Sequence, residues 1–245
     1  MRTLKLTVAY DGTRYSGWQI QPGKPTIQDI LERVFRTVLR ESARVIGSGR
    51  TDAGVHAEAQ VAHIRTRSQL APTRILRHAN ALLPQDIVVT DLDDAPDRFH
   101  AQYSATRKQY RYRMYLGEAP TPFIRPYVHV VRGRLNVTRM RREAVHLQGV
   151  HDFRAFVKQG SLGEKSARRT LYQVQLKQVG RELHFHVEGN GFLHLMVRSM
   201  IGTLLDIGRG HLPEGHIRKM LTRKQRLLAG KTAPAKGLSL IRVQY

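Results

Sequence analysis

Residues 26–39 read TIQDILERVFRTVL, and their apolar pattern sets the fold expected for the first half of the chain. Apolar side chains recur every three or four positions, at Ile27, Ile30, Leu31, Val34, Phe35, Val38 and Leu39. That spacing places them on one face of an α-helix. Thr26 precedes the pattern and Asp29 lies three residues later, as in a capping box at the start of a helix. The stretch is therefore the most clearly helical segment of the sequence.

Strand patterns surround this helix. Residues 4–10 alternate apolar and polar side chains with the period of a β-strand. After the helix, the sequence predicts strands over 43–47 and 57–65, a second helix over 73–82 and a strand over 86–92. The resulting order, βαββαβ, is that of a split βαβ, ferredoxin-like unit.

The second half of the chain repeats this order. Its predicted elements are a strand over 108–116, a helix over 138–148, a hairpin over 170–178 and 182–188 around Gly180, an apolar helix over 191–207, a short helix from Pro213 and a last strand over 237–245. The expected fold class is therefore α+β, with two ferredoxin-like βαββαβ lobes whose mainly antiparallel sheets flank a basic active-site cleft. The lobes comprise residues 1–98 and 99–245. Residues 117–136 contain three prolines and are expected to form a loop or an extension of the second lobe.

The charge balance indicates a polyanionic partner. The chain carries 41 Lys+Arg against 19 Asp+Glu, a formal net charge of +22, and the basic residues are spread from Arg2 to Arg242. A positive field of this size concentrates polyanions at the surface and speeds their encounter. Solubility alone is a poor explanation for this net charge. The sequence shows no basic amphipathic helix of the kind that binds an anionic membrane. Nucleic acid is therefore the favoured partner.

Composition also argues against several other classes of protein. The chain has no cysteine, which rules out disulfides, thiolate zinc sites and cysteine nucleophiles. Its 12 histidines lack an accompanying cysteine or carboxylate cluster, so no metal is expected. The first ten residues alternate like a strand and lack the apolar core of a signal peptide. No apolar run approaches the length of a membrane span. We expect a cytoplasmic protein with no membrane partner.

Residues 47–56, GSGRTDAGVH, gather the side chains that a reaction would need. Three glycines within eight residues permit sharp turns and the close approach of a ligand. Among them lie the cation of Arg50 and the carboxylate of Asp52, with a hydroxyl and an imidazole nearby. This set suits a catalytic loop, but a tight turn closed by the Asp52 side chain explains the residue types equally well. A phosphate loop is excluded by the spacing.

Sequence blocks along nearly the whole chain resemble those of one family. GRTDAGVHA (49–57) resembles the catalytic signature of TruA-type pseudouridine synthases. Further blocks resemble that family in the same order: YDGTRYSGWQIQ (10–21), NALLPQDIVV (80–89), RFHAQYSATRKQYRY (98–112), HDFRAF (151–156), GNGFLHLMVRSMIGTLLDIG (189–208) and TAPAKGLSL (232–240). Among the departures, Ser48 replaces a more usual alanine and Leu195 a common histidine. Neither changes the aspartate.

The resemblance implies a reaction and the residues that perform it. Such an enzyme breaks the bond between uracil N1 and ribose C1′, turns the base and joins C5 to C1′, a redox-neutral isomerisation that needs no cofactor. Asp52 is the implied catalytic carboxylate, acting at the sugar, at the base or on a proton. Arg198 is the implied cationic partner of Asp52, and Arg50, two residues away on the same loop, is a second candidate. Tyr110 is the implied residue that stacks on the uracil, and Tyr112, on the same strand face, is the alternative.

Two placements follow as expectations. Arg198 lies in the apolar helix predicted over 191–207, where an unpaired charge is expensive, so a buried anionic partner is expected. Asp52, Tyr110 and Arg198 should therefore converge in one cleft although they are distant in the sequence. Trp18, the only tryptophan, is either a base-stacking platform or a core residue.

The resemblance also implies the substrate and the assembly. It implies action on uridines at positions 38 to 40 in the anticodon stem-loop of tRNA, by a homodimer. Two alternatives stay open: a pseudouridine synthase that acts on another RNA, and a non-catalytic RNA-binding or chaperone protein with the same fold.

Overall fold

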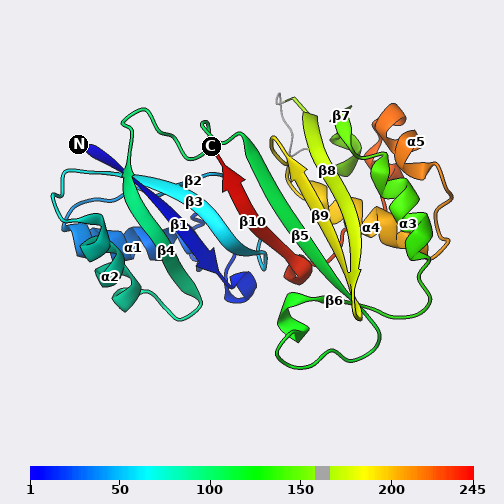
Figure 1. The fold of residues 1–245 in the computed structure, drawn as a ribbon, viewed down its shortest axis with the longest axis horizontal. Helices are drawn as coiled ribbons and strands as arrows, with labels where there is room; N and C mark the ends of the chain where they lie inside the picture. The colour runs from blue at the N-terminus through cyan, green and yellow to red at the C-terminus, as the bar shows by residue number, and fades with distance from the viewer. Residues whose placement is uncertain (158–165) are drawn as a thin grey trace. The chain divides into compact units, whose positions relative to one another are not determined.

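A computed structural model describes residues 1–157 and 166–245 of the chain (Figure 1). The chain forms two compact units. Met1–Thr106 and Ser239–Tyr245 together form unit 1, and Arg107–Leu238 form unit 2. Strands and helices occur in both units, which confirms the predicted α+β fold class.

Unit 1 is built on an almost wholly antiparallel sheet. Its strands are β1 (Arg2–Tyr10), β2 (Ile46–Gly47), β3 (His56–Thr66), β4 (Ile87–Ala95) and β10 (Leu238–Gln244), in the order β4-β1-β3-β10 with β2 beside β3. β1 pairs antiparallel with both β3 and β4, whereas β10 runs parallel to β3. The predicted alternation is confirmed, because Leu4, Leu6 and Val8 on one face of β1 are completely buried.

The helices of unit 1 bury the apolar faces that the sequence predicts. They are α1 (Ile27–Leu39) and α2 (Pro72–Leu82), and α2 packs against both α1 and β4. α1 begins at the predicted cap, where the Thr26 side chain accepts a hydrogen bond from the Asp29 amide at 3.4 Å. Ile27, Leu31 and Phe35 are completely buried, so the predicted helix face does supply the core.

Unit 2 contains five further strands and three α-helices. Its strands are β5 (Arg107–Leu116), β6 (His129–Val131), β7 (Gly149–Asp152), β8 (Arg168–Val179) and β9 (Glu182–Gly189), in the order β6-β5-β9-β8-β7. Its helices are α3 (Val137–Val145), α4 (Met196–Gly208) and α5 (His216–Arg223). β8 and β9 form the predicted hairpin around Gly180, which adopts the left-handed φ of 57° that such a turn requires (Figure 1).

Short 3-10 helices complete the two units. They are η1 (Gly12–Arg14), η2 (Arg125–Tyr127), η3 (Arg154–Phe156), η4 (Arg226–Leu228) and η5 (Ala235–Gly237). In the described ranges, no helix is both long enough and apolar enough to cross a membrane.

Four elements differ from their sequence-based predictions. The apolar helix predicted over 191–207 begins only at Met196, because Leu195 adopts a left-handed φ of 61° and ends the preceding loop. β6 and β7 were not predicted, since three or four residues are too few to show a period. The last strand forms as predicted but pairs with β3 of unit 1, whereas the sequence pattern placed it at the end of the second lobe.

Candidate active site

The loop that carries Asp52 connects β2 to β3 in unit 1. These two strands are antiparallel neighbours, so the loop leaves the sheet and returns to it within a few residues. The Ser48 amide donates to the Val61 carbonyl at 2.7 Å and extends this pairing. Beyond Asp52 the chain turns at Gly54, which has a φ of 74°, and the Val55 amide donates to the Asp52 carbonyl at 3.1 Å. The aspartate therefore lies on a tight turn anchored at both ends by strands.

The segment after β1 holds this loop through its backbone. The Trp18 amide donates to the Thr51 carbonyl at 3.1 Å, and the Gly54 amide donates to the Tyr15 carbonyl at 3.3 Å. Gly17 has a φ of 91°, and a Cβ there would lie only 2.4 Å from the Thr51 carbonyl oxygen. Glycine is therefore required at position 17 for the close approach of the two chains.

Buried side chains fix the same loop from beneath. The Tyr10 hydroxyl and the Thr51 hydroxyl are hydrogen-bonded at 2.9 Å. Burial raises the pKa of Tyr10 to about 12, so the phenol stays protonated. Ser48 donates to the Gln60 side chain at 2.7 Å, and Gln60 donates to the Gly49 carbonyl at 2.9 Å. These contacts set the position of the backbone on either side of Asp52.

These supporting residues were missed by the sequence analysis. Ser48 was considered only as a departure from alanine, yet it is completely buried and bonded to Gln60. Strand alternation could have placed Gln60 on an inward face. No sequence signal could have named its partner, because the two residues meet only through the pairing of β2 with β3.

Trp18 is a core residue in this structure. Its side chain is only 2% exposed, and its ring centroid lies 6.2 Å from that of Tyr10. A Cβ on Gly47 would lie 2.6 Å from the indole, so the ring is packed directly against the start of the loop. Of the two functions predicted for Trp18, the structure supports packing beneath the loop rather than an open stacking surface.

Asp52 and Arg50 differ in how exposed they are. Asp52 is half-buried, whereas Arg50 is exposed and donates from Nε to the Gln19 side-chain carbonyl at 3.1 Å. Thr51 between them is buried. The loop thus presents one carboxylate and one cation, with the intervening residue serving as the anchor.

Tyr110 and Tyr112 lie on the same face of β5 in unit 2, and both side chains are buried. Tyr112 is completely buried and donates its hydroxyl to the Pro234 carbonyl at 2.8 Å, and burial raises its pKa. Tyr110 is 8% exposed and packs edge-to-face with Phe192, with ring centroids 5.0 Å apart. Tyr112 is therefore held by a contact within its own unit, and the choice of Tyr110 as the stacking residue stays a prediction.

Arg198 lies in the first turn of α4 rather than in the helix interior. It is half-buried, its Nε donates to the Ala233 carbonyl at 2.8 Å, and its own carbonyl accepts from the Ala233 amide at 3.0 Å. A Cβ on Gly202 would lie 1.7 Å from the Lys231 carbonyl oxygen, so the segment before β10 packs closely along α4. Arg198 is thus held by backbone contacts of its own unit. Its pairing with Asp52 stays a prediction.

His184 contacts neighbouring protein side chains. His184 lies 2.8 Å from Glu182, which also accepts two hydrogen bonds from Arg113 at 2.8 Å. Within residues 1–157 and 166–245, no group of three or more His, Cys, Asp or Glu side chains is arranged to hold a metal ion.

Comparison with known proteins gives the family. The family model described as tRNA pseudouridine synthase matches residues 6–104 and 144–245. Curated relatives described as "tRNA pseudouridine synthase A" include those of an Exiguobacterium species and Geobacter sulfurreducens, each 42% identical over the whole chain and 98% and 100% of their own lengths. The Bacillus subtilis relative is 42% identical over 99% of this chain and 98% of its own. The chain belongs to the tRNA pseudouridine synthase family, which confirms the resemblance found in the sequence.

The solved structures compared are more distant. The crystal structure of an archaeal box H/ACA sRNP Nop10-Cbf5 complex aligns with 82% of this chain and 43% of that chain, at 15% identity and a TM-score of 0.36. That likeness is too low to bear on the site. Asp52, Arg50 and Arg198 lie within the two segments matched by the family model, whereas Tyr110 lies between them.

Proposed function

We propose that this chain isomerises uridine to pseudouridine at positions 38, 39 and 40 in the anticodon stem-loop of tRNA. It acts as a cytoplasmic homodimer without a cofactor. The observation that carries the proposal is the Asp52 loop, whose signature sequence is intact and whose backbone is held by the backbones of Trp18 and Tyr15. Membership of the family over the full length of the chain supports the same conclusion.

The reaction assigns Asp52 its task. Breaking the bond from N1 to C1′ and forming one from C5 to C1′ leaves the atoms of uridine unchanged, with one proton lost from C5 and one gained at N1. Positive character develops on the sugar as the first bond breaks. A carboxylate can stabilise that charge, form a temporary bond or move the proton. A rigid turn suits each of these tasks, because the carboxylate must be aimed before the bond breaks.

The other site residues bind the substrate. Arg50 presents a cation beside Asp52, Arg198 supplies the second cation, and the Tyr110 ring stacks on the target base. Residues 1–98 carry the aspartate loop and residues 99–245 complete a basic cleft. The target base must leave its stack, at a cost of a few kcal/mol. Stacking on Tyr110 and phosphate contacts from arginines of the cleft offset that cost.

Nucleotide mapping of pseudouridine is the decisive experiment. Purified protein is incubated with unmodified tRNA, and every uridine is then assayed. We expect conversion confined to positions 38, 39 and 40, and none in a matched tRNA with cytidine at those positions. Conversion elsewhere, or in ribosomal RNA alone, would replace the proposed substrate, and no conversion in any RNA would leave the non-catalytic RNA-binding function. The solution mass of the protein tests the dimer.

A further inference from the structure

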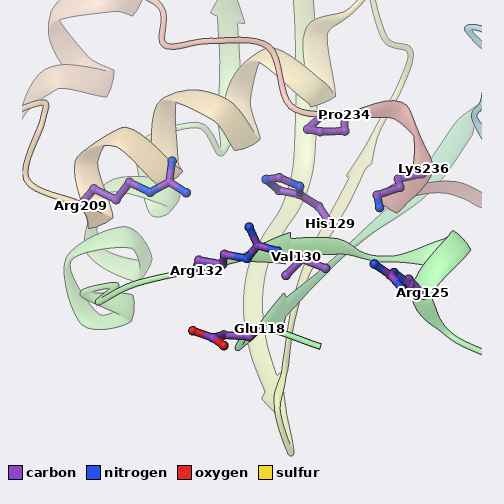
Figure 2. A pocket seen from close by; sticks show the side chains of 8 residues that line it. All are labelled: Glu118, Arg125, His129, Val130, Arg132, Arg209, Pro234 and Lys236. Atoms are coloured by element: carbon purple, nitrogen blue, oxygen red, sulfur yellow. The ribbon is translucent and has the colours of Figure 1, made fainter. Parts of the chain in front are cut away.

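A basic pocket of about 540 Å³ opens on unit 2, and none of the residues assigned above lines it (Figure 2). Its charged and titratable lining consists of Glu118, Arg125, His129, Arg132, Arg209 and Lys236. Glu118, Arg125, His129 and Arg132 lie between the two segments that the family model matches. The pocket therefore draws mainly on a part of the chain that the family description does not cover.

Separate elements of unit 2 present these cations to one space. Arg125 lies in η2, Arg132 directly follows β6, and Arg209 caps the C-terminal end of α4. Lys236 lies in η5, which contacts η2. Figure 2 shows Arg132 and Arg209 on one side of His129, and Arg125 and Lys236 on the other. The backbone thus positions four positive charges around one imidazole.

The three arginines are not neutralised by the protein. Arg125, Arg132 and Arg209 are exposed, and in the described part of the chain they make no side-chain hydrogen bond or ion pair. Glu118, the one carboxylate of the lining, forms no ion pair with them there. Burial lowers the pKa of His129, and the nearby charges of Arg209 and Lys236 lower it further. The pocket is therefore a strongly positive site, where a bound anion would relieve mutual repulsion.

An exposed aromatic ring lies two residues before Arg125. Phe123 is 88% exposed, the highest value among the large apolar side chains of the described residues. An exposed ring beside clustered cations is the combination that binds single-stranded nucleic acid, because the ring stacks on a base while the cations contact the backbone. A free inorganic anion has no base to stack on such a ring, so the ring favours a nucleic acid as the ligand.

We propose that this pocket binds backbone phosphates of the RNA substrate through Arg125, Arg132, Arg209 and Lys236, while Phe123 stacks on a neighbouring base. This inference rests on the proposed function, since it assumes an RNA substrate. It adds a binding site, distinct from the Asp52 loop, that contacts unpaired or distorted RNA. Glu118 limits the affinity by repelling phosphate.

Binding measurements on the full-length protein test the site. Affinity for a fluorescent anticodon stem-loop is measured over a range of salt for the wild type, Arg132→Gln and Arg209→Gln. Arg223→Gln is the matched control, an exposed arginine of α5 outside the pocket. Each pocket variant should bind at least about fivefold more weakly and lower the log–log salt slope by about one. The control should change affinity less than about twofold.

Further variants distinguish the contribution of the Phe123 ring to RNA binding from that of the charged side chains. Phe123→Ala should weaken binding at least about fivefold without changing the salt slope, and Phe123→Tyr should restore it, because stacking is independent of salt. Glu118→Gln should tighten binding. In NMR titrations, the added RNA should raise the pKa of His129, since a nearby anion favours the imidazolium.

The outcomes separate this proposal from the proposed function. Pocket variants that bind RNA as Arg223→Gln does would overturn the pocket. The proposal would also be overturned if inorganic pyrophosphate, at constant ionic strength, bound through Arg132 and Arg209 while the variants kept the RNA affinity of the wild type. A changed solution mass in those variants without weaker RNA binding would assign the surface to subunit contact instead. If the variants weaken RNA binding but the wild type makes no pseudouridine, the pocket stands and the proposed function fails.

Discussion

The Asp52 loop and the basic pocket are built in opposite ways. Around Asp52, Thr51 is bonded to Tyr10 and Trp18, and Gln60 holds the Gly49 carbonyl, so nearly every neighbouring group has a buried partner. In the pocket, the exposed side chains of Arg125, Arg132 and Arg209 project from separate elements and make no side-chain hydrogen bond or ion pair in the described part of the chain. Chemistry on one bond requires a fixed carboxylate, whereas binding a polyanion requires accumulated charge on side chains that can adjust.

The largest expected effect comes from removing the charge that the rigid loop holds. Asp52→Asn keeps the shape of the side chain but should lower the single-turnover rate by at least about 10³-fold, because no carboxylate then acts on the sugar or the proton. RNA affinity should change little, since phosphate contacts dominate it. Rates and affinities measured on the same preparation check both statements. Near-normal turnover would show that the loop is not the catalytic element.

The second prediction tests the rigidity itself. Gly17→Ala should destabilise the protein by about 3 kcal/mol and reduce turnover, because the new Cβ collides with the Thr51 carbonyl and alanine is strained at this φ. Gly23→Ala is the matched control. Gly23 also has a positive φ, 68°, but nothing lies within 4 Å of a Cβ there, so only about 1 kcal/mol of backbone strain is expected. Equal losses in urea unfolding would mean that the close approach of the two chains is not needed.

The third and smallest effect extends the comparison to two histidines. His63 in unit 1 is buried, and its Nδ1 accepts a hydrogen bond from the Ala101 amide at 3.1 Å. Burial, and then the positive charges of His100 and Arg65, lower its pKa from 6.5 to about 4. His129 has a lowered pKa as well, but it faces a pocket that an anion can enter.

The sign of the pH effect follows from that shift. Between pH 6.5 and 4 the unfolded state binds a proton at His63 that the folded state does not, so stability falls as the pH falls. His63→Gln keeps an acceptor for the Ala101 amide and removes the titration, so its unfolding free energy should depend less on pH over this window. Identical pH profiles for the two proteins would contradict the neutral, buried state of His63.

Much of the fold could be predicted from local patterns. The spacing of Ile27, Leu31 and Phe35 and the cap at Thr26 gave α1 to within a residue, because helix periodicity and capping are local properties. The start of α4 could not be predicted, since nothing in the apolar run reveals that Leu195 adopts a left-handed conformation. The pairing of β10 with β3 could not be predicted either, because it joins residues far apart in the chain.

The functional residues also divide into those that local sequence could identify and those that it could not. Asp52 and Arg50 could be identified because one short loop contains both, and because that loop resembles a family signature. Tyr10 and Gln60, which support the loop, come from different strands and meet only in the folded sheet. The basic pocket was not predicted at all. Its cations come from four separate segments, and none of them stands out among 41 Lys and Arg residues.

The return of the chain to unit 1 has a consequence for synthesis on the ribosome. Ser239 and Leu240 pair with His56 and Ala57, the part of β3 that directly follows the Asp52 loop. All of unit 2 is translated before that pairing can form. At a translation rate of about 5–20 residues per second, this delay is roughly ten seconds or longer. During that time the edge of β3 beside the loop has no β10 partner, and an exposed edge is where nascent chains pair wrongly. The last strand to be synthesised is thus the one that completes the support of the loop.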